Sequence, residues 1–182
     1  MAELKTLHNF FECERRDFYV AKRQILKALP KIINAVSDER LREALSEHLQ
    51  ETRGEVDRLE RASESPGDKA KRKPRFGMEG ILEERRDRLD EEGSEAVMNA
   101  AVIAGRQRVE HGEFTAYVSL MAWAKILGYS DTLDLLKANE YEVKAADAKL
   151  AKLAESTIKT QAEAVGEEID CDQSRKPQRS KR

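Results

Sequence analysis

The stretch AVIAGRQRVEHGEFTAYVSLMAWAKILG, residues 101–128, decides the fold of this chain. Its small and apolar residues recur at steps of three and four, which predicts one face of a long α-helix. The residues of that face are Val102, Gly105, Val109, Gly112, Ala116, Leu120, Trp123 and Leu127. Glu110 and Glu113 lie beside the face, three residues apart, so both can turn toward whatever the helix packs on. Carboxylates near a buried seam are costly unless a cation, hydrogen bonds or a metal satisfies them.

Length and composition favour a single helical domain. The chain has 182 residues, of which 37% are charged and 5% aromatic, a mixture that favours helices over sheets. A formal net charge of −2 gives no general attraction to nucleic acid or to a membrane surface. No apolar run approaches the roughly 20 residues that span a bilayer, and no export signal is visible. Cys13 and Cys171 lack metal-type spacing, so we expect a reduced, cytoplasmic protein.

The rest of the chain divides into three further long helices and one short helix. The first helix is expected from about residue 3 to residue 29, with a kink or restart at Pro30. An N-cap at Ser37 or Asp38 opens the second, and Ser94 opens the long helix that ends at Gly128. Between the second helix and this long helix lie a basic loop, residues 62–76, and a short helix, residues 77–92. The last helix is expected to be capped by Ser130 and Asp131 and to continue to about residue 164.

Four long helices with a mid-chain crossover predict an all-α four-helix bundle of up-down-down-up connectivity. We expect the bundle to occupy residues 1–165. Residues 166–182 carry almost no apolar side chain, so we expect a disordered polar and basic tail. The basic loop and the tail lack the interleaved aromatic residues of single-strand nucleic-acid sites, and solvated segments explain them more simply.

Every long helix carries residues that are able to bind a metal. In a four-helix bundle, inward carboxylates and histidines at one level of the four helices hold a metal pair. The candidates are Glu14, Asp17, His48, Glu51, Glu55, Glu110, His111, Glu113, Glu140 and Glu142. The alternative is that most acidic pairs in so charged a chain lie on solvated faces and that His48 is a hydrogen-bonded interior residue. The sequence contains no Gly-rich phosphate loop, GxSxG turn or CxxC motif, so no other catalytic motif is an alternative to the hypothesis of a metal site.

Several segments together carry a family resemblance. They are RRDFYVAKRQILKALPKI (15–32), HLQETRGEVDRLE (48–60), MEGILEE (78–84), QRVEHGEFTAY (107–117), AWAKILG (122–128) and KAADAKL (144–150). In this order and spacing they resemble the YciE/YciF-type ferritin-like family over nearly everything but the tail. MEGILEE together with VEH-x-E and AWAK-x-LG is the specific part of the match.

The resemblance implies a fold and a chemistry. The fold is a ferritin-like four-helix bundle with a short helix in the crossover, forming a homodimer. The chemistry is kinship with rubrerythrin-like dimetal carboxylate proteins that bind iron or manganese, together with an association with bacterial stress responses. The activity of the family is poorly defined. By position, the resemblance implies that the metal-facing residues are Glu51, Glu55, Glu110, Glu113 and Glu142. Glu14 and His48 stay weaker candidates from the residue pattern alone.

This chain departs from the family pattern in its first helix. Lys22 stands where the family usually has a Glu suited to ligation, Glu55 stands where Gln or His is usual, and Val143 replaces an acidic residue. A protonated ammonium cannot bind a metal, but it can neutralise inward carboxylates directly. One hypothesis is therefore that Lys22 takes over the electrostatic task of the metal, and that the protein binds metal weakly or not at all. The opposing hypothesis is that Glu14 or Asp17 supplies the ligand from the first helix.

Two classes of function remain open at this point. The first is a dimetal oxidoreductase, or a protein that handles peroxide or iron. The second is a non-catalytic, homodimeric, stress-associated bundle whose metal site is replaced by a cluster of salt bridges around Lys22. The sequence alone does not decide whether the protein is an enzyme.

Overall fold

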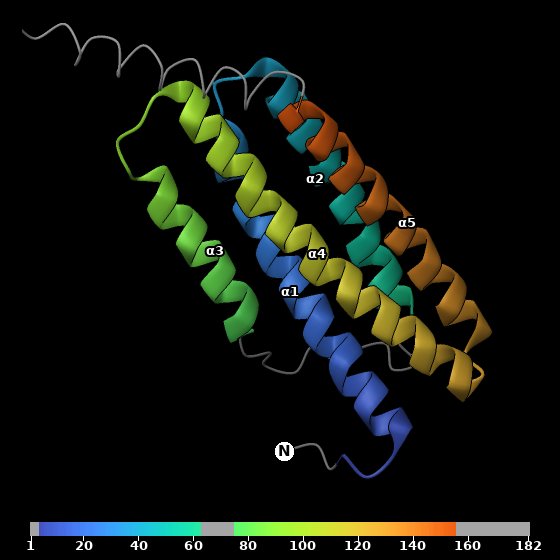
Figure 1. The fold of residues 1–182 in the computed structure, drawn as a ribbon. Helices are drawn as coiled ribbons and strands as arrows, with labels where there is room; N and C mark the ends of the chain where they lie inside the picture. Colours follow the sequence, from blue (N-terminus) through green and yellow to red (C-terminus); the bar gives the residue numbers. More distant parts are fainter. Residues whose placement is uncertain (1–3, 63–74, 156–182) are drawn as a thin grey trace, which may run out of the picture.

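A computed structural model describes residues 4–62 and 75–155, which form five helices and no strand. The helices are α1 (Leu7–Ala35), α2 (Glu39–Arg61), α3 (Phe76–Leu89), α4 (Glu95–Leu127) and α5 (Ser130–Leu153). Figure 1 shows the four long helices side by side, with the shorter α3 outside them. The prediction of an all-α four-helix bundle with an additional short helix is confirmed.

The four long helices form a ring in which each packs against two others. α1 contacts α2, α2 contacts α5, α5 contacts α4, and α4 closes the ring on α1. Neighbours in this ring run antiparallel, so α2 and α4, which the long crossover joins, run in the same direction (Figure 1). α3 lies within the crossover and packs against α1 and α4 from outside. The predicted up-down-down-up order therefore holds for α1, α2, α4 and α5.

Apolar side chains fill both ends of the bundle. One cluster contains Phe11, Phe18, Tyr117, Leu120 and Leu136, and Tyr129 packs against it after the end of α4. The other contains Ile32, Leu41, Leu45, Val102, Ile103, Leu150 and Ala154. A smaller group, Ile25, Leu29 and Val109, lies on α1 and α4. Burial of this apolar surface is the dominant favourable term in folding, and it leaves a polar section within the bundle.

The helix ends agree with the predicted caps at three positions. Asp38 Oδ1 accepts hydrogen bonds from the backbone N–H groups of Arg40 and Leu41, each at 3.0 Å. Ser94 Oγ accepts from Val97 N–H at 3.4 Å. Gly128 has φ = 76°, the left-handed conformation that ends α4.

Two predicted boundaries were wrong. α1 begins at Leu7, not at residue 3. At Pro30, where the sequence left a kink or a restart open, the helix continues to Ala35, and Ile32 beyond the proline is buried. α5 starts at Ser130 with Tyr129 as its N-cap residue, and no side chain caps it. The end of the last helix near residue 164 lies outside the described residues, as do residues 63–74 of the basic loop and the tail.

The buried face of α4 differs from the predicted one. Glu110 and Glu113 lie at the centre of that face and are fully buried, whereas Gly112 is exposed. Arg106 and Tyr117 are also fully buried on it. The face turned toward the bundle is therefore more polar than the apolar periodicity indicated. No helix among the described residues is long and apolar enough to cross a membrane.

Gly112 within α4 and Gly128, its C-cap residue, allow a matched test of the backbone. Neither Gly128 nor Gly112 has any atom within 4 Å of an added Cβ, so only conformation differs between them. Gly128→Ala places a Cβ in the left-handed region and is expected to lower the free energy of unfolding by about 1–2 kcal/mol. Gly112→Ala, within the helix, is expected to raise it by about 0.5–1 kcal/mol. Urea unfolding of both variants measures the difference, and equal effects would contradict the assignment of the α4 end.

Candidate functional site

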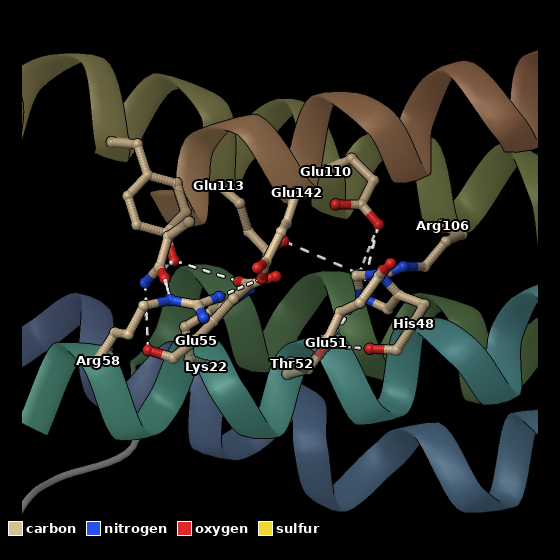
Figure 2. Close-up of polar contacts among 12 residues, drawn as sticks. Lys22, His48, Glu51, Thr52, Glu55, Arg58, Arg106, Glu110, Glu113 and Glu142 are labelled. Atoms are coloured by element: carbon tan, nitrogen blue, oxygen red, sulfur yellow. Dashed lines mark hydrogen bonds and ion pairs between the residues drawn. The ribbon is translucent and has the colours of Figure 1, made fainter. Parts of the chain in front are cut away.

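Lys22 of α1 links three helices inside the bundle (Figure 2). Its Nζ pairs with Glu55 Oε2 of α2 and lies 2.8 Å from Glu113 Oε1 of α4. All three side chains are fully buried. The periodicity of α1 explains the placement, because Lys22 stands on the same face as the buried Phe18, Ile25 and Leu29. A cation on an apolar helix face therefore enters the core and meets two carboxylates there.

The charges within this group of three side chains shift the pKa values of Lys22 and Glu55. Burial opposes the charged form of Lys22, but Glu113 and Glu55 outweigh it, so the pKa of Lys22 is raised above its usual value. Burial raises the pKa of Glu55 although Lys22 opposes the rise. Lys22 therefore stays an ammonium at neutral pH.

A second group of charges lies next to the first on α2 and α4. Arg106 Nη2 lies 2.5 Å from Glu110 Oε1 and 3.8 Å from Glu113 Oε2, and it also contacts His48 Nε2. His48 Nε2 is 3.6 Å from Glu110 Oε1. The Arg106–Glu110 contact is an ion pair whose geometry is not that of a hydrogen bond, and both carboxylate oxygens of Glu110 lack a hydrogen-bond partner. Glu113 thus lies between Lys22 and Arg106.

Burial shifts the titration of this second group strongly. It raises the pKa of Glu110 to about 8, with Arg106 opposing the rise and Glu113 adding to it. Burial, together with the positive charge of Arg106 and Lys22, lowers the pKa of His48 well below its usual value. His48 is therefore neutral at pH 7, and its Nε2 is available to accept from Arg106.

A neutral hydrogen-bond network holds Glu55 in place. Tyr117 OH donates to Glu55 Oε2 at 3.2 Å, and Asn139 Nδ2 of α5 donates to Tyr117 OH and to the Glu55 backbone carbonyl, each at 3.1 Å. Burial and the charges of Glu55 and Glu113 raise the pKa of Tyr117 well above its usual value, so it remains a phenol. All four long helices thus contribute to one polar cluster.

Two of the predicted ligands lie at the edge of the cluster. The Glu51 side chain is 41% exposed, with Oε2 3.5 Å from His48 Nδ1. Glu142 is half-buried and accepts from Arg58, which also donates to Asn139. Both carboxylates therefore face solvent at the α2–α5 side and are not enclosed with Glu55, Glu110 and Glu113.

Other candidates lie away from the cluster. Glu14 and Asp17 line a groove with Trp123 on another side of the bundle, and Asp17 pairs with Arg75 at 2.5 Å. The hypothesis that Glu14 or Asp17 supplies the ligand from the first helix is therefore not supported by their positions. His111 is exposed beside Asp147 at 3.4 Å, and Glu140 pairs with Lys144. His111 therefore lies on a solvated helix face, whereas the Glu140 side chain is only 16% exposed beside Lys144.

Sequence reasoning missed three members of the cluster: Arg106, Tyr117 and Asn139. Arg106 precedes Glu110 by four residues and Tyr117 follows Glu113 by four, so both stand on the helix face of these acids. That spacing was the available signal for them. Asn139 lies one turn before the buried Val143 on α5 but has no distinguishing pattern in the sequence.

The arrangement does not fit a metal pair. Among the described residues, no group of three or more His, Cys, Asp or Glu side chains is placed to hold a metal ion. The donor set explains this, because Lys22 and Arg106 occupy the space between Glu55, Glu110 and Glu113 (Figure 2). Two cations therefore stand among three acidic side chains, at the level of the bundle where a dimetal protein holds its metal pair.

Fold and site together define a helical-bundle protein with a polar centre. Its sequence also matches a known protein family. Residues 6–163 match the family described as Domain of unknown function (DUF892). The chain is 37% identical to protein YciF of Escherichia coli (strain K12) over 161 residues, which cover 88% of this chain and 97% of that protein. It therefore belongs to the YciF-type DUF892 family.

Two solved structures are similar to this fold. The crystal structure of the E. coli stress protein YciF matches with a TM-score of 0.78 and 38% identity, covering 83% of this chain and 96% of that one. YcfI from Rhodopseudomonas palustris, described as a candidate structural protein, matches with a TM-score of 0.77 and 34% identity, covering 82% and 95%. The family resemblance inferred from the sequence motifs is confirmed.

Substitution of Glu110 tests the electrostatics of the site. Between about pH 4.5 and about pH 8 the native state retains a proton on Glu110 that the unfolded chain releases. Stability therefore decreases as pH rises through this range. Glu110→Gln removes this dependence, so its free energy of unfolding is expected to increase relative to the unsubstituted protein by a few kcal/mol from pH 5 to pH 9. Urea unfolding at pH 5, 7 and 9 measures the trend, and Glu83→Gln at an exposed position of α3 is the control. A difference independent of pH would contradict the raised pKa.

Proposed function

We propose that this protein is a metal-independent, non-catalytic helical bundle of the YciF-type family. The observation that carries the proposal is the Lys22 ammonium, which is fully buried between Glu55 and Glu113. In this proposal the ion pairs around Lys22 replace a dimetal site. The protein then acts through its surfaces, as a structural or binding component, and not by redox chemistry.

Electrostatics supports the replacement. Unit charges of like sign 4 Å apart repel by about 4 kcal/mol at the effective dielectric constant of a protein. A divalent ion placed among Glu55, Glu110 and Glu113 meets both Lys22 and Arg106 at comparable distances, since these cations already contact the same carboxylates. Binding of the ion therefore requires that at least one cation leaves the cluster or loses its proton.

The biological setting of the proposal comes from the family. The E. coli relative is described as a stress protein, which supports a stress-associated role for this chain. The description of YcfI as a candidate structural protein supports the non-catalytic reading. The homodimer and the cytoplasmic location implied by the family resemblance and the sequence remain proposals.

Metal analysis tests the proposal directly. Protein expressed with added iron or manganese is expected to carry far less than one tightly bound metal per chain, and a chelator is expected to leave its melting temperature unchanged. The matched variants are Lys22→Glu, which restores the acidic residue usual in the family, and Lys22→Met, which removes the charge alone. Lys22→Glu is expected to raise metal content more than Lys22→Met does, and elemental analysis measures both. About two metals per chain in the unsubstituted protein would overturn the proposal.

A mutant cycle tests whether Lys22 neutralises the cluster. Lys22→Met leaves Glu55 and Glu113 without their common cation and is expected to lower the free energy of unfolding by about 3–5 kcal/mol. Combining it with Glu55→Gln and Glu113→Gln removes the uncompensated charges and is expected to recover a large part of that loss. Urea unfolding at pH 7 measures the free energy of unfolding of four proteins. They are the unsubstituted protein, Lys22→Met, the double variant Glu55→Gln with Glu113→Gln, and the triple variant. A triple variant no more stable than Lys22→Met would show that lost packing, not charge, causes the effect.

One specific observation favours a second candidate function. Four buried carboxyl oxygens, Glu55 Oε1, Glu110 Oε1, Glu110 Oε2 and Glu113 Oε2, have no hydrogen-bond partner among the described residues. These oxygens are acceptors for a cation, which favours a protein that binds iron or manganese and handles iron or peroxide. The metal analysis described above separates this candidate from the metal-independent bundle.

A further inference from the structure

A groove between α1 and α3 is not used by the polar cluster. It encloses about 930 Å³, within the size range of ligand sites in proteins. Apolar side chains of both helices, among them Val20, Ile32, Leu82 and Leu89, form part of its lining. A groove of this kind accepts an amphipathic ligand whose apolar side faces the lining.

The charges on this groove are almost all positive. Arg23, Lys27 and Lys31 of α1 line it at four-residue spacing, and all three are exposed. Successive members of such a row stand about 6 Å apart along the helix axis. Arg86 of α3 adds a further exposed cation, and the acidic residue in the lining is Glu79. A row of cations beside an apolar floor matches a ligand with several carboxylates in line better than one with a single acidic group.

Arg85 provides an independent indication of an anion site. It lines the groove, is only 6% exposed, and its Nη1 and Nη2 have no hydrogen-bond partner among the described residues. Its side chain is held against α4 at Gly105, where an added Cβ would lie 3.0 Å from Arg85 Cγ and Nε. A buried guanidinium with unpaired donors is costly, and an anion in the groove reduces that cost.

The chain itself contains a segment of the required chemistry. Residues 163–172, EAVGEEIDCD, carry five acidic residues and no basic one, with Val165 and Ile169 as apolar members. The match to the family ends at residue 163, so nearly all of this segment lies beyond it.

The end of α5 is within reach of the groove. Ala154 packs in the cluster that contains Ile32, and Leu89 packs against the same cluster. Ile32 and Leu89 also line the groove. Adjacent helix axes lie 8–10 Å apart, so the diagonal of the bundle is roughly 14 Å. The eight residues 156–163 span at most about 28 Å when extended, which is sufficient to bring the acidic segment to the groove.

We propose that the acidic segment, residues 163–172, binds in the groove between α1 and α3 of the same chain. Its carboxylates face Arg23, Lys27, Lys31 and Arg86, and its apolar side chains face the floor. Because the segment is tethered, its effective concentration at the groove is on the order of millimolar. Weak individual ion pairs are then sufficient for occupancy, and the segment competes with any other acidic ligand for this surface.

Cys171 allows the contact to be trapped in the full-length protein. Cys13→Ser removes the other thiol, and Ala28→Cys then places a thiol in the groove without removing a groove charge. In air-saturated buffer, with dissolved oxygen as the oxidant of the two thiols, we expect an intramolecular disulfide to form about tenfold faster than in the control, Ala148→Cys on α5. That control position is exposed and nearer to Cys171 along the chain, so tethering alone favours the control. Mass spectrometry and non-reducing electrophoresis of dilute protein measure the rate.

Two further conditions make the test decisive. Glu167→Lys, Glu168→Lys and Asp170→Lys together are expected to reduce trapping at Ala28→Cys to the control rate. High salt is expected to slow it severalfold, because it screens the exposed cations. Equal rates at the two positions, or trapping that ignores charge reversal, would overturn the proposal. Disulfides formed only between two chains would show that the segment binds a second copy instead, which also overturns it.

Discussion

The structure depends on one buried contact, the Lys22 ammonium between Glu55 and Glu113. An ammonium in a helix core is costly, and so are two carboxylates, but together they satisfy one another. Because the three residues come from α1, α2 and α4, the contact holds these helices at one level. Arg106 contacts Glu110, whose raised pKa keeps it protonated at neutral pH, and Tyr117 and Asn139 add neutral hydrogen bonds around Glu55. Charge balance inside the bundle thus takes the place of metal coordination in our proposal.

This cluster contributes to specificity more than to stability. Buried ion pairs often add little net stability compared with apolar side chains of the same shape, whereas loss of one partner is severe. The free energy of folding comes mainly from the apolar clusters, including Phe11 with Leu120 at one end and Leu45 with Leu150 at the other. The polar section then favours the arrangement in which Lys22 meets both Glu55 and Glu113. A sliding of α4 by one turn would separate Glu113 from Lys22.

Much of the fold was predictable because local chemistry encodes it. The cap at Asp38, the N-cap at Ser94 and the left-handed Gly128 mark helix ends by their own backbone preferences. At Pro30 the sequence left a kink or a restart open, and the structure has one continuous helix there, because burial of residues beyond the proline outweighs a local break. Within the site, helical periodicity placed Glu110 and Glu113 only beside the buried face of their helix, and the family resemblance implied the inward position of Glu55. Arg106 was missed because a long cation at such a position more often reaches solvent.

By itself, the sequence determined where the helices lie, their order along the chain and the family motifs. It also showed acidic residues at helical spacing, because spacing along one helix decides which side chains share a face. Only the tertiary structure decided which cation meets which acid. Lys22 lies 91 residues from Glu113 along the chain, and nothing local distinguishes pairing with Glu113 from pairing with Glu110. In the structure, Glu51 and Glu142 lie at the edge of the polar cluster, and Arg106 is the cation that contacts Glu110. The physical reason is that side-chain pairing depends on the relative heights and rotations of packed helices, which the packing of the whole core determines.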